Sequence, residues 1–107
     1  DGGLVGDLAR STIEQFNFDF AVIGCSALRS NGDLMDFDMQ EVGVSKAIIA
    51  HSDQVFLVAD SSKFERKAPA RVASMRDITA VFTDKSVPAA CRAACELSGT
   101  KLVCAQD

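Results

Sequence analysis

The sequence predicts an α/β fold, a Rossmann-like parallel sheet with helices on both faces. Two short apolar runs, residues 20–24 and 55–59, have the length of strands that are buried on both sides. Segments with helical spacing of apolar residues alternate with these runs. Because parallel strands need a crossover connection, which is usually a helix, the alternation indicates a parallel sheet. The 107 residues suffice for one domain or part of one.

The first half of the chain supplies one strand between two helices. A nearly continuous apolar run that ends at Gly24 is typical of a buried strand, and the pair Asn31-Gly32 is a strong turn signal. Three glycines among the first six residues indicate either a flexible entry or a close backbone approach. In chain order we expect a helix, a strand, a loop, a turn and a second helix at residues 7–16, 18–23, 24–27, 30–33 and 41–51.

The second half of the chain continues the alternation. Pro88 falls near the first turn of a helical segment, where a missing N–H does no harm. Val72 lies in a looser stretch that allows a short edge strand. We expect strands at residues 54–59, 78–83 and 101–105, and a helix at residues 88–98. The predicted order is α-β-α-β-(β)-β-α-β, with no repeat and no second domain.

Charge and composition exclude several classes of protein. A net charge of −4 and a pI near 4.8 argue against a grip on nucleic acid, which relies on Lys and Arg. No apolar run approaches the ~20 residues of a membrane span. The chain opens without an initiator Met or a signal peptide, so we expect a piece of a longer cytoplasmic protein that has no membrane partner.

The four cysteines, Cys25, Cys91, Cys95 and Cys104, match no zinc spacing, and no disulfide is expected in a reducing cytosol. Cys91 and Cys95 lie four residues apart on one helix face and have the spacing to chelate an ion or be oxidised. The favoured interpretation is that both are small buried apolar residues. We expect no metal site and no cofactor.

Two polar clusters follow predicted strands, where ligands of open α/β sheets bind. The small residues Gly24, Cys25, Ser26 and Ala27 allow backbone N–H groups to approach an anion, or they simply turn the chain. The segment 60–63 places a carboxylate, two hydroxyls and an ammonium at a second strand end.

In that second cluster Lys63 has the chemistry to hold a phosphate, or else Asp60 begins a turn and Lys63 is solvated.

Lys46, early in a predicted helix, either faces a ligand or lies at the surface. Asp36 and Asp38 flank Phe37 and would share one face, where carboxylates bind a metal or sugar hydroxyls, or form a solvated rim. His51 is interpreted as structural. No P-loop, dinucleotide fingerprint or nucleophile elbow is present. The residues alone indicate a binder of a small anionic ligand, or an enzyme that has lost its catalytic groups.

An ordered series of segments resembles the effector-binding domain of the DeoR family of bacterial transcriptional repressors. Its most specific part is Asp60-Ser61-Ser62-Lys63-Phe64, and it covers nearly the whole chain at residues 18–27, 32–34, 46–49, 58–64 and 83–84. Residues 1–6, 15–20 and 36–42 further suggest a member that responds to glycerol 3-phosphate.

The resemblance implies a cytoplasmic repressor whose operator DNA is bound by a winged helix-turn-helix domain outside this chain. It implies that residues 1–107 are the C-terminal part of the sensor domain, without the phosphate loop at its start. The implied effector is a phosphorylated sugar or polyol, with glycerol 3-phosphate the first expectation. The effector-binding residues would be Gly24, Cys25, Ser26, Ala27, Lys46, Asp60 and Lys63. We also expect a homo-oligomer, since palindromic operators favour symmetric repressors.

The sensor domain of this family is similar to ribose-5-phosphate isomerase, which makes an enzyme the alternative. The isomerase has an acidic loop where residues 24–27 stand, and a catalytic glutamate where Ser45 stands. An isomerase needs a carboxylate that moves a proton between carbons. We therefore expect no catalytic residue and no enzyme activity. A third possibility is an oligomerisation domain that senses nothing.

Overall fold

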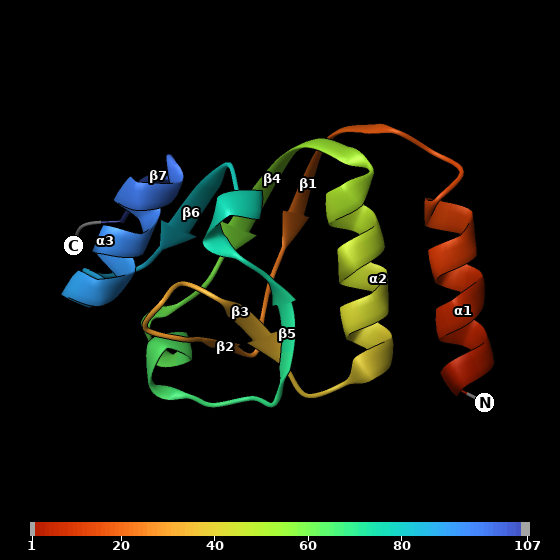
Figure 1. Ribbon diagram of the computed structural model, residues 1–107, viewed down its shortest axis with the longest axis horizontal. Helices are drawn as coiled ribbons and strands as arrows, with labels where there is room; N and C mark the ends of the chain where they lie inside the picture. The colour runs from red at the N-terminus through yellow and green to blue at the C-terminus, as the bar shows by residue number, and fades with distance from the viewer. Residues whose placement is uncertain (1, 106–107) are drawn as a thin grey trace.

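Four parallel strands form the main sheet of the computed structural model, which describes residues 2–105 (Figure 1). They are β1 (Phe18–Ile23), β4 (Ser52–Val58), β6 (Ala80–Thr83) and β7 (Lys101–Cys104), in the spatial order β1-β4-β6-β7. Every neighbouring pair is parallel. The predicted α/β fold with a Rossmann-like parallel sheet is confirmed.

A row of apolar side chains crosses the sheet and forms the centre of the core. Ile23 pairs with Leu57, Leu57 with Val81 and Val81 with Leu102. Leu57 and Val81 are fully buried, and the row belongs to one contiguous cluster. Because successive residues of a strand point to opposite faces, this row fixes which face of the sheet is the inner one.

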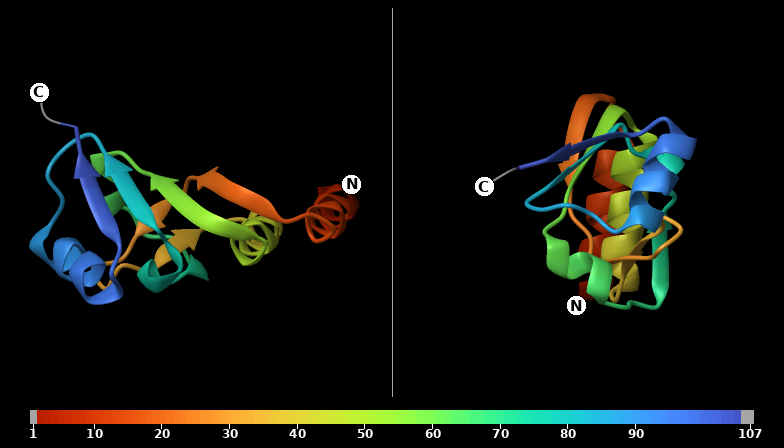
Figure 2. Two further views of the ribbon diagram at one scale, coloured as in Figure 1. Left: turned by 90° about the horizontal axis from the view of Figure 1, so that it is seen from above. Right: turned by 90° about the vertical axis from the view of Figure 1, so that its left-hand side faces the viewer.

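Helices α2 (Met39–Ala50) and α3 (Ala89–Ser98) lie on that inner face (Figure 2). In α3 the residues turned to the sheet are Cys91 and Cys95, each 1% exposed. The prediction that both cysteines are small buried residues is confirmed. Pro88 stands at the N-cap of α3, and Gly99 ends the helix in the left-handed conformation, with φ of 73°.

The outer face of the sheet is bare within residues 2–105, so the expected helices cover one face only. Its side chains are apolar and largely open to solvent, with Phe20 60%, Val22 62% and Val58 53% exposed. Phe56 bridges Phe20 and Phe82, with ring centroids 6.1 and 5.9 Å apart. The expectation of helices on both faces is therefore wrong for this part of the chain.

Helix α1 (Gly2–Ile13) explains the difference, because it packs against α2 and not against the sheet (Figures 1 and 2). A Cβ atom added at Gly6 would lie 3.2 Å from Cβ of Gln40, so the glycine lets the two helices approach closely. Of the two interpretations of the opening glycines, close approach fits Gly6. The flexible entry is wrong, since the helix already begins at Gly2.

A small antiparallel sheet lies beyond the carboxyl end of β1 (Figure 1). It consists of β2 (Ala27–Leu28), β3 (Leu34–Asp36) and β5 (Ala70–Ala73), in the order β2-β3-β5. The predicted edge strand around Val72 is confirmed as β5, and the predicted turn at residues 30–33 joins β2 to β3. Strands β2 and β3 are too short to show a period of two, so the sequence pattern missed them.

Two 3₁₀ helices complete the chain: η1 (Ser61–Glu65) follows β4, and η2 (Met75–Asp77) follows β5. Helix η1 packs against β2, which brings the polar segment after β4 beside the loop after β1. The carboxyl ends of the two neighbouring strands therefore share one region of the surface.

Candidate functional site

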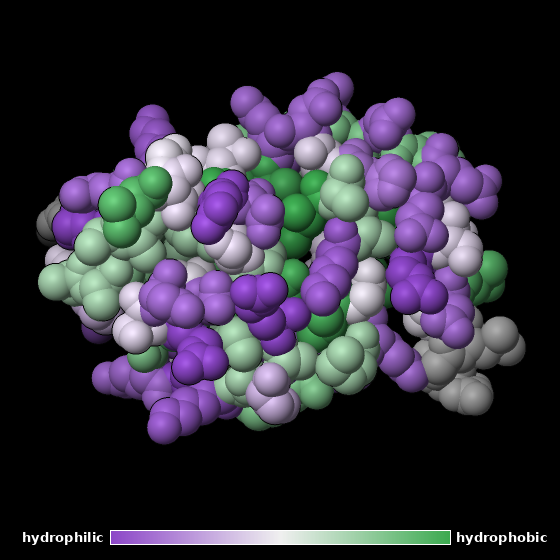
Figure 3. Space-filling model, in the orientation of Figure 1, coloured by the Kyte–Doolittle hydropathy of each residue, from purple (hydrophilic) through white to green (hydrophobic). Residues whose placement is uncertain are grey.

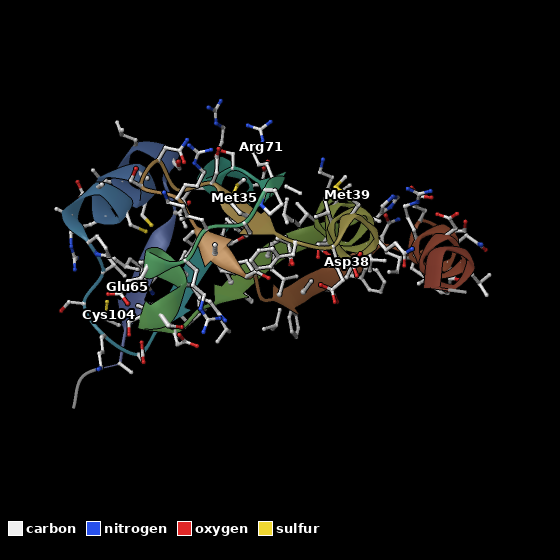
Figure 4. All side chains as sticks on the ribbon, turned by 90° about the horizontal axis from the view of Figure 1, so that it is seen from below. Met35, Asp38, Met39, Glu65, Arg71 and Cys104 are labelled. Carbon is white, nitrogen blue, oxygen red and sulfur yellow. The ribbon has the colours of Figure 1, made fainter. Side chains whose placement is uncertain are left out.

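A cavity of about 760 Å³ opens where the carboxyl end of β1 meets helices α1 and α2. Its polar lining comes from the loop after β1, the end of β3 and the first turns of α2, and includes Gly24, Cys25, Ser26, Asp36, Asp38 and Glu41. Figure 3 shows the opposite side of the two helices, where a gap between α1 and α2 marks a smaller hollow beside Met39 and Gly43. Figure 4 places Asp38 at the start of α2, between the small sheet and α1. The sequence predicted this strand end as a ligand site, but not the contribution of α1.

Asp36 is held in the wall of this cavity by two hydrogen bonds to the same oxygen. The Ser26 hydroxyl donates to Oδ1 of Asp36 at 2.8 Å, and the amide of Phe37 donates to Oδ1 at 2.8 Å. Asp38 has a structural role. Its Oδ1 accepts a hydrogen bond from the amide of Gln40 at 2.8 Å and caps the N-terminus of α2. This cap begins the helix at Met39, two residues before the predicted start.

Only part of the backbone of residues 24–27 is available to a ligand. The amide of Ser26 donates to the carbonyl of Met35 at 3.0 Å. Ala27 pairs with Met35 in the small sheet, and its side chain is completely buried. Within residues 2–105 no protein acceptor takes a hydrogen bond from the amides of Gly24 and Cys25, so both remain for an anion.

The pKa of the Cys25 thiol is shifted by burial and by the charged groups near this loop. Burial raises its pKa to about 11; Lys63 acts in the opposite direction, and Asp36 and Asp60 raise it further. At neutral pH the sulfur is therefore a neutral thiol and not a nucleophile. Lys63, Asp36 and Asp60 all lie close enough to Cys25 to influence its charge.

The segment after β4 is a capped turn. The Asp60 carboxylate accepts hydrogen bonds from the amide of Ser62 at 2.9 Å and from the Ser62 hydroxyl, and these bonds lower the pKa of Asp60. The amide of Ser61 donates to Oδ1 of Asp84 at 2.9 Å, which ties the turn to the end of β6. Within residues 2–105 no ion pair joins Asp60 to Lys63, so the hypothesis of a turn holds for Asp60. Lys63 itself is half-buried.

Lys46 is not brought to this site. It is exposed on α2, whereas its neighbours Val44 and Ser45 line the cavity. Each residue turns a helix by 100°, so the position after Ser45 points away from the cavity. The structure thus gathers Gly24, Cys25 and Ser26 with Asp60 and Lys63 nearby, and leaves Lys46 outside.

Comparison with known proteins shows the family to which the chain belongs. The sequence model of the DeoR C-terminal sensor domain matches residues 1–85. The chain belongs to the DeoR sensor-domain family.

Three of the similar proteins are bacterial transcriptional repressors. The chain is 45% identical over 83 residues to the glycerol-3-phosphate regulon repressor of Haemophilus influenzae, covering 78% of this chain and 32% of that protein. It is 42% identical over 88 residues to the repressor of the same name in Escherichia coli, covering 82% and 35%. It is 33% identical over 107 residues to the transcriptional repressor CsqR of E. coli, covering 100% and 41%. The chain spans between about a third and two fifths of the length of these relatives.

Two polar positions of this DeoR sensor domain bear on the isomerase alternative. Ser26 and Ser45 both line the cavity, at places where the resemblance to the isomerase calls for an acidic loop and a glutamate. Three carboxylates do line the cavity, from Asp36, Asp38 and Glu41. The sequence allows Asp36 and Asp38 to be either ligand-binding carboxylates or a solvated rim, and the structure places both in the cavity wall. The alternation of Asp36 and Asp38 around Phe37 was the one signal that pointed to them.

The part of the chain that the structure describes contains neither a metal site nor a membrane-spanning helix. No group of three or more His, Cys, Asp or Glu side chains in residues 2–105 is placed to hold a metal ion. No helix among the same residues has the length and apolarity needed to cross a membrane. All four cysteines are free thiols.

Proposed function

We propose that this chain is the effector-sensing module of a bacterial transcriptional repressor that binds a phosphorylated polyol or sugar and then releases operator DNA. Glycerol 3-phosphate is the first candidate, because two of the similar proteins are named repressors of the glycerol-3-phosphate regulon. The observation that carries the proposal is the cavity at the carboxyl end of β1, near which Lys63 lies on the η1 segment that packs against β2. Ligands of open parallel sheets bind at such strand ends.

The residues of the site have distinct tasks in this proposal. The amides of Gly24 and Cys25 and the ammonium of Lys63 hold the phosphate. Asp60 stabilises the turn that carries Lys63 through its bonds to Ser62. Ala27, also expected at the site, contributes through the loop conformation, whereas Lys46 lies outside the site on the surface of α2. A phosphate loop that precedes this chain would complete the site.

Binding releases DNA only if the effector prefers one conformation of the repressor. An effector that binds the DNA-free state more tightly shifts the equilibrium by that difference in affinity. The operator is bound by a helix-turn-helix domain outside residues 1–107, and a cytoplasmic homo-oligomer matches the symmetry of a palindromic operator. The net charge of −4 suits a sensor module that does not itself contact DNA.

The experiment is calorimetric titration of the intact protein with glycerol 3-phosphate, ribose 5-phosphate, fructose 1-phosphate and inorganic phosphate. We expect saturable, selective binding of glycerol 3-phosphate without turnover. The Lys63→Ala variant should lose binding and the effector response but retain operator binding. Lys101→Ala is the matched control, since Lys101 is an exposed lysine at the opposite, amino-terminal end of a strand.

The other outcomes separate the alternatives. Selective binding of a different sugar phosphate would keep the sensor and replace the effector. Conversion of ribose 5-phosphate would establish the isomerase alternative. Absence of binding to all four compounds would refute the sensor and leave an oligomerisation domain.

A further inference from the structure

The lining of the cavity is acidic, whereas the neighbouring η1 segment carries the cation Lys63. The acidic residues that line the cavity are Asp36, Asp38 and Glu41, and no Lys or Arg of residues 2–105 is among its lining. Lys63 lies in η1, which packs against β2, the strand that directly follows the loop at residues 24–26. A phosphate dianion is repelled by carboxylates and attracted by an ammonium, so the two sides are not equivalent for a ligand with one anionic end.

The nearest arginine along α1 does not change this asymmetry. Arg10 pairs with Asp7 at 3.4 Å and lines a separate, smaller hollow beside Gly43. The carboxylates of the cavity also do not form a metal site within the described residues. What remains for them is the acceptance of hydrogen bonds from neutral donors, of which hydroxyls are the donors a polyol offers.

Asp36 is the carboxylate best prepared to accept such a bond. Both hydrogen bonds to its side chain, from the hydroxyl of Ser26 and the amide of Phe37, use Oδ1, and within residues 2–105 no bond occupies Oδ2. Its side chain is half-buried and already oriented, so little rotamer freedom is lost on binding. Glu41, by contrast, is exposed, and Asp38 is engaged in the cap of α2.

We infer that Asp36 accepts a hydrogen bond from the hydroxyl end of a phosphorylated polyol, which binds with its phosphate toward Lys63 and its hydroxyls in the cavity. The inference rests on the proposed function and assigns the residue that selects for hydroxyls. Ser26 acts as a positioning residue, because its hydroxyl fixes the Asp36 carboxylate at 2.8 Å.

The test measures hydroxyl selectivity in the intact protein. Glycerol 3-phosphate is titrated beside n-propyl phosphate, which has the same phosphate and carbon chain without the two hydroxyls. The wild type should prefer glycerol 3-phosphate by about 10- to 100-fold, as expected for a hydrogen bond to a charged group. Asp36→Ala should abolish most of this preference and leave n-propyl phosphate binding within about twofold. Asp36→Asn should reduce the preference in part, as should Ser26→Ala.

Controls separate this inference from the proposed function. Asp53→Asn removes an exposed carboxylate near the start of β4, away from the site, and should leave the preference unchanged. Lys63→Ala should weaken both ligands equally. If wild type binds neither compound, the proposed function fails and this inference with it. If wild type prefers glycerol 3-phosphate but both Asp36 variants keep that preference, only the present inference is overturned. Tighter binding of both ligands by Asp36→Ala would overturn it too, because the phosphate would then face Asp36.

Discussion

Gly32 occupies a turn with no room for a side chain, and Gly32→Ala is expected to destabilise the chain by about 1–5 kcal/mol. Its φ of +92° lies in the left-handed region, where a Cβ adds about 1–2 kcal/mol of strain. A Cβ at this position would also lie 2.9 Å from Cβ of Ala94 and 3.0 Å from Cβ of Met75. Such overpacking costs about 1–3 kcal/mol. Alanine also lowers the conformational entropy of the unfolded chain, which offsets about 0.4–1 kcal/mol of the loss in stability.

Gly99 provides a matched control, since it has a similar φ of +73° but no atom within 4 Å of an added Cβ. Gly99→Ala should therefore show the backbone strain alone, about 1 kcal/mol. The assay is equilibrium unfolding of both variants in urea. The free energies of unfolding are compared with the same dependence on urea concentration for both variants. Equal losses for the two variants would refute the contact of the 30–33 turn with α3 and η2.

Two other perturbations test the core and the bare face of the sheet. Burial raises the pKa of Cys25 to about 11 and of Cys91 to about 12, from an ordinary value of 9.0. The stability that these neutral thiols contribute is full below pH 9 and is lost as the pH rises through 11 to 12. We expect the urea midpoint to fall over this range, and less so in Cys91→Ala; a midpoint independent of pH would contradict the burial. On the outer face, Val22→Thr with Val58→Thr should lower binding of a hydrophobic dye to residues 1–107 while changing stability by under about 1 kcal/mol. Unchanged dye binding would mean that this face is covered.

Elements with strong local signals could be predicted from the sequence. The strand at residues 18–23 was predicted with the bounds that the structure shows, and the helix at 88–98 within one residue. Both carry continuous or periodic apolar residues, and Pro88 and Gly99 mark the helix ends. The small sheet could not be predicted apart from its edge strand, because β2 and β3 contain two and three residues.

The candidate site divides in the same way. The loop after β1 and the turn after β4 follow from chemistry at strand ends, which a sequence shows directly. The direction of Lys46 does not, because α2 carries apolar residues around much of its circumference and its phase is set by packing against the sheet and α1. Asp36 could be noticed but not placed, since its partner Ser26 lies ten residues earlier.

The sequence by itself determined the class of fold, the parallel sheet, the two polar clusters and the resemblance to the DeoR family, all of which depend on neighbours in the chain. Only the tertiary structure decided that α1 packs on α2, that this packing forms a cavity with a carboxylate lining, and that one face of the sheet is bare within residues 2–105. The physical reason is that contacts between elements depend on their relative orientation. Close approach at Gly6 sets that orientation here; the glycines of the opening segment indicate a close approach, but not that α2 is the element approached.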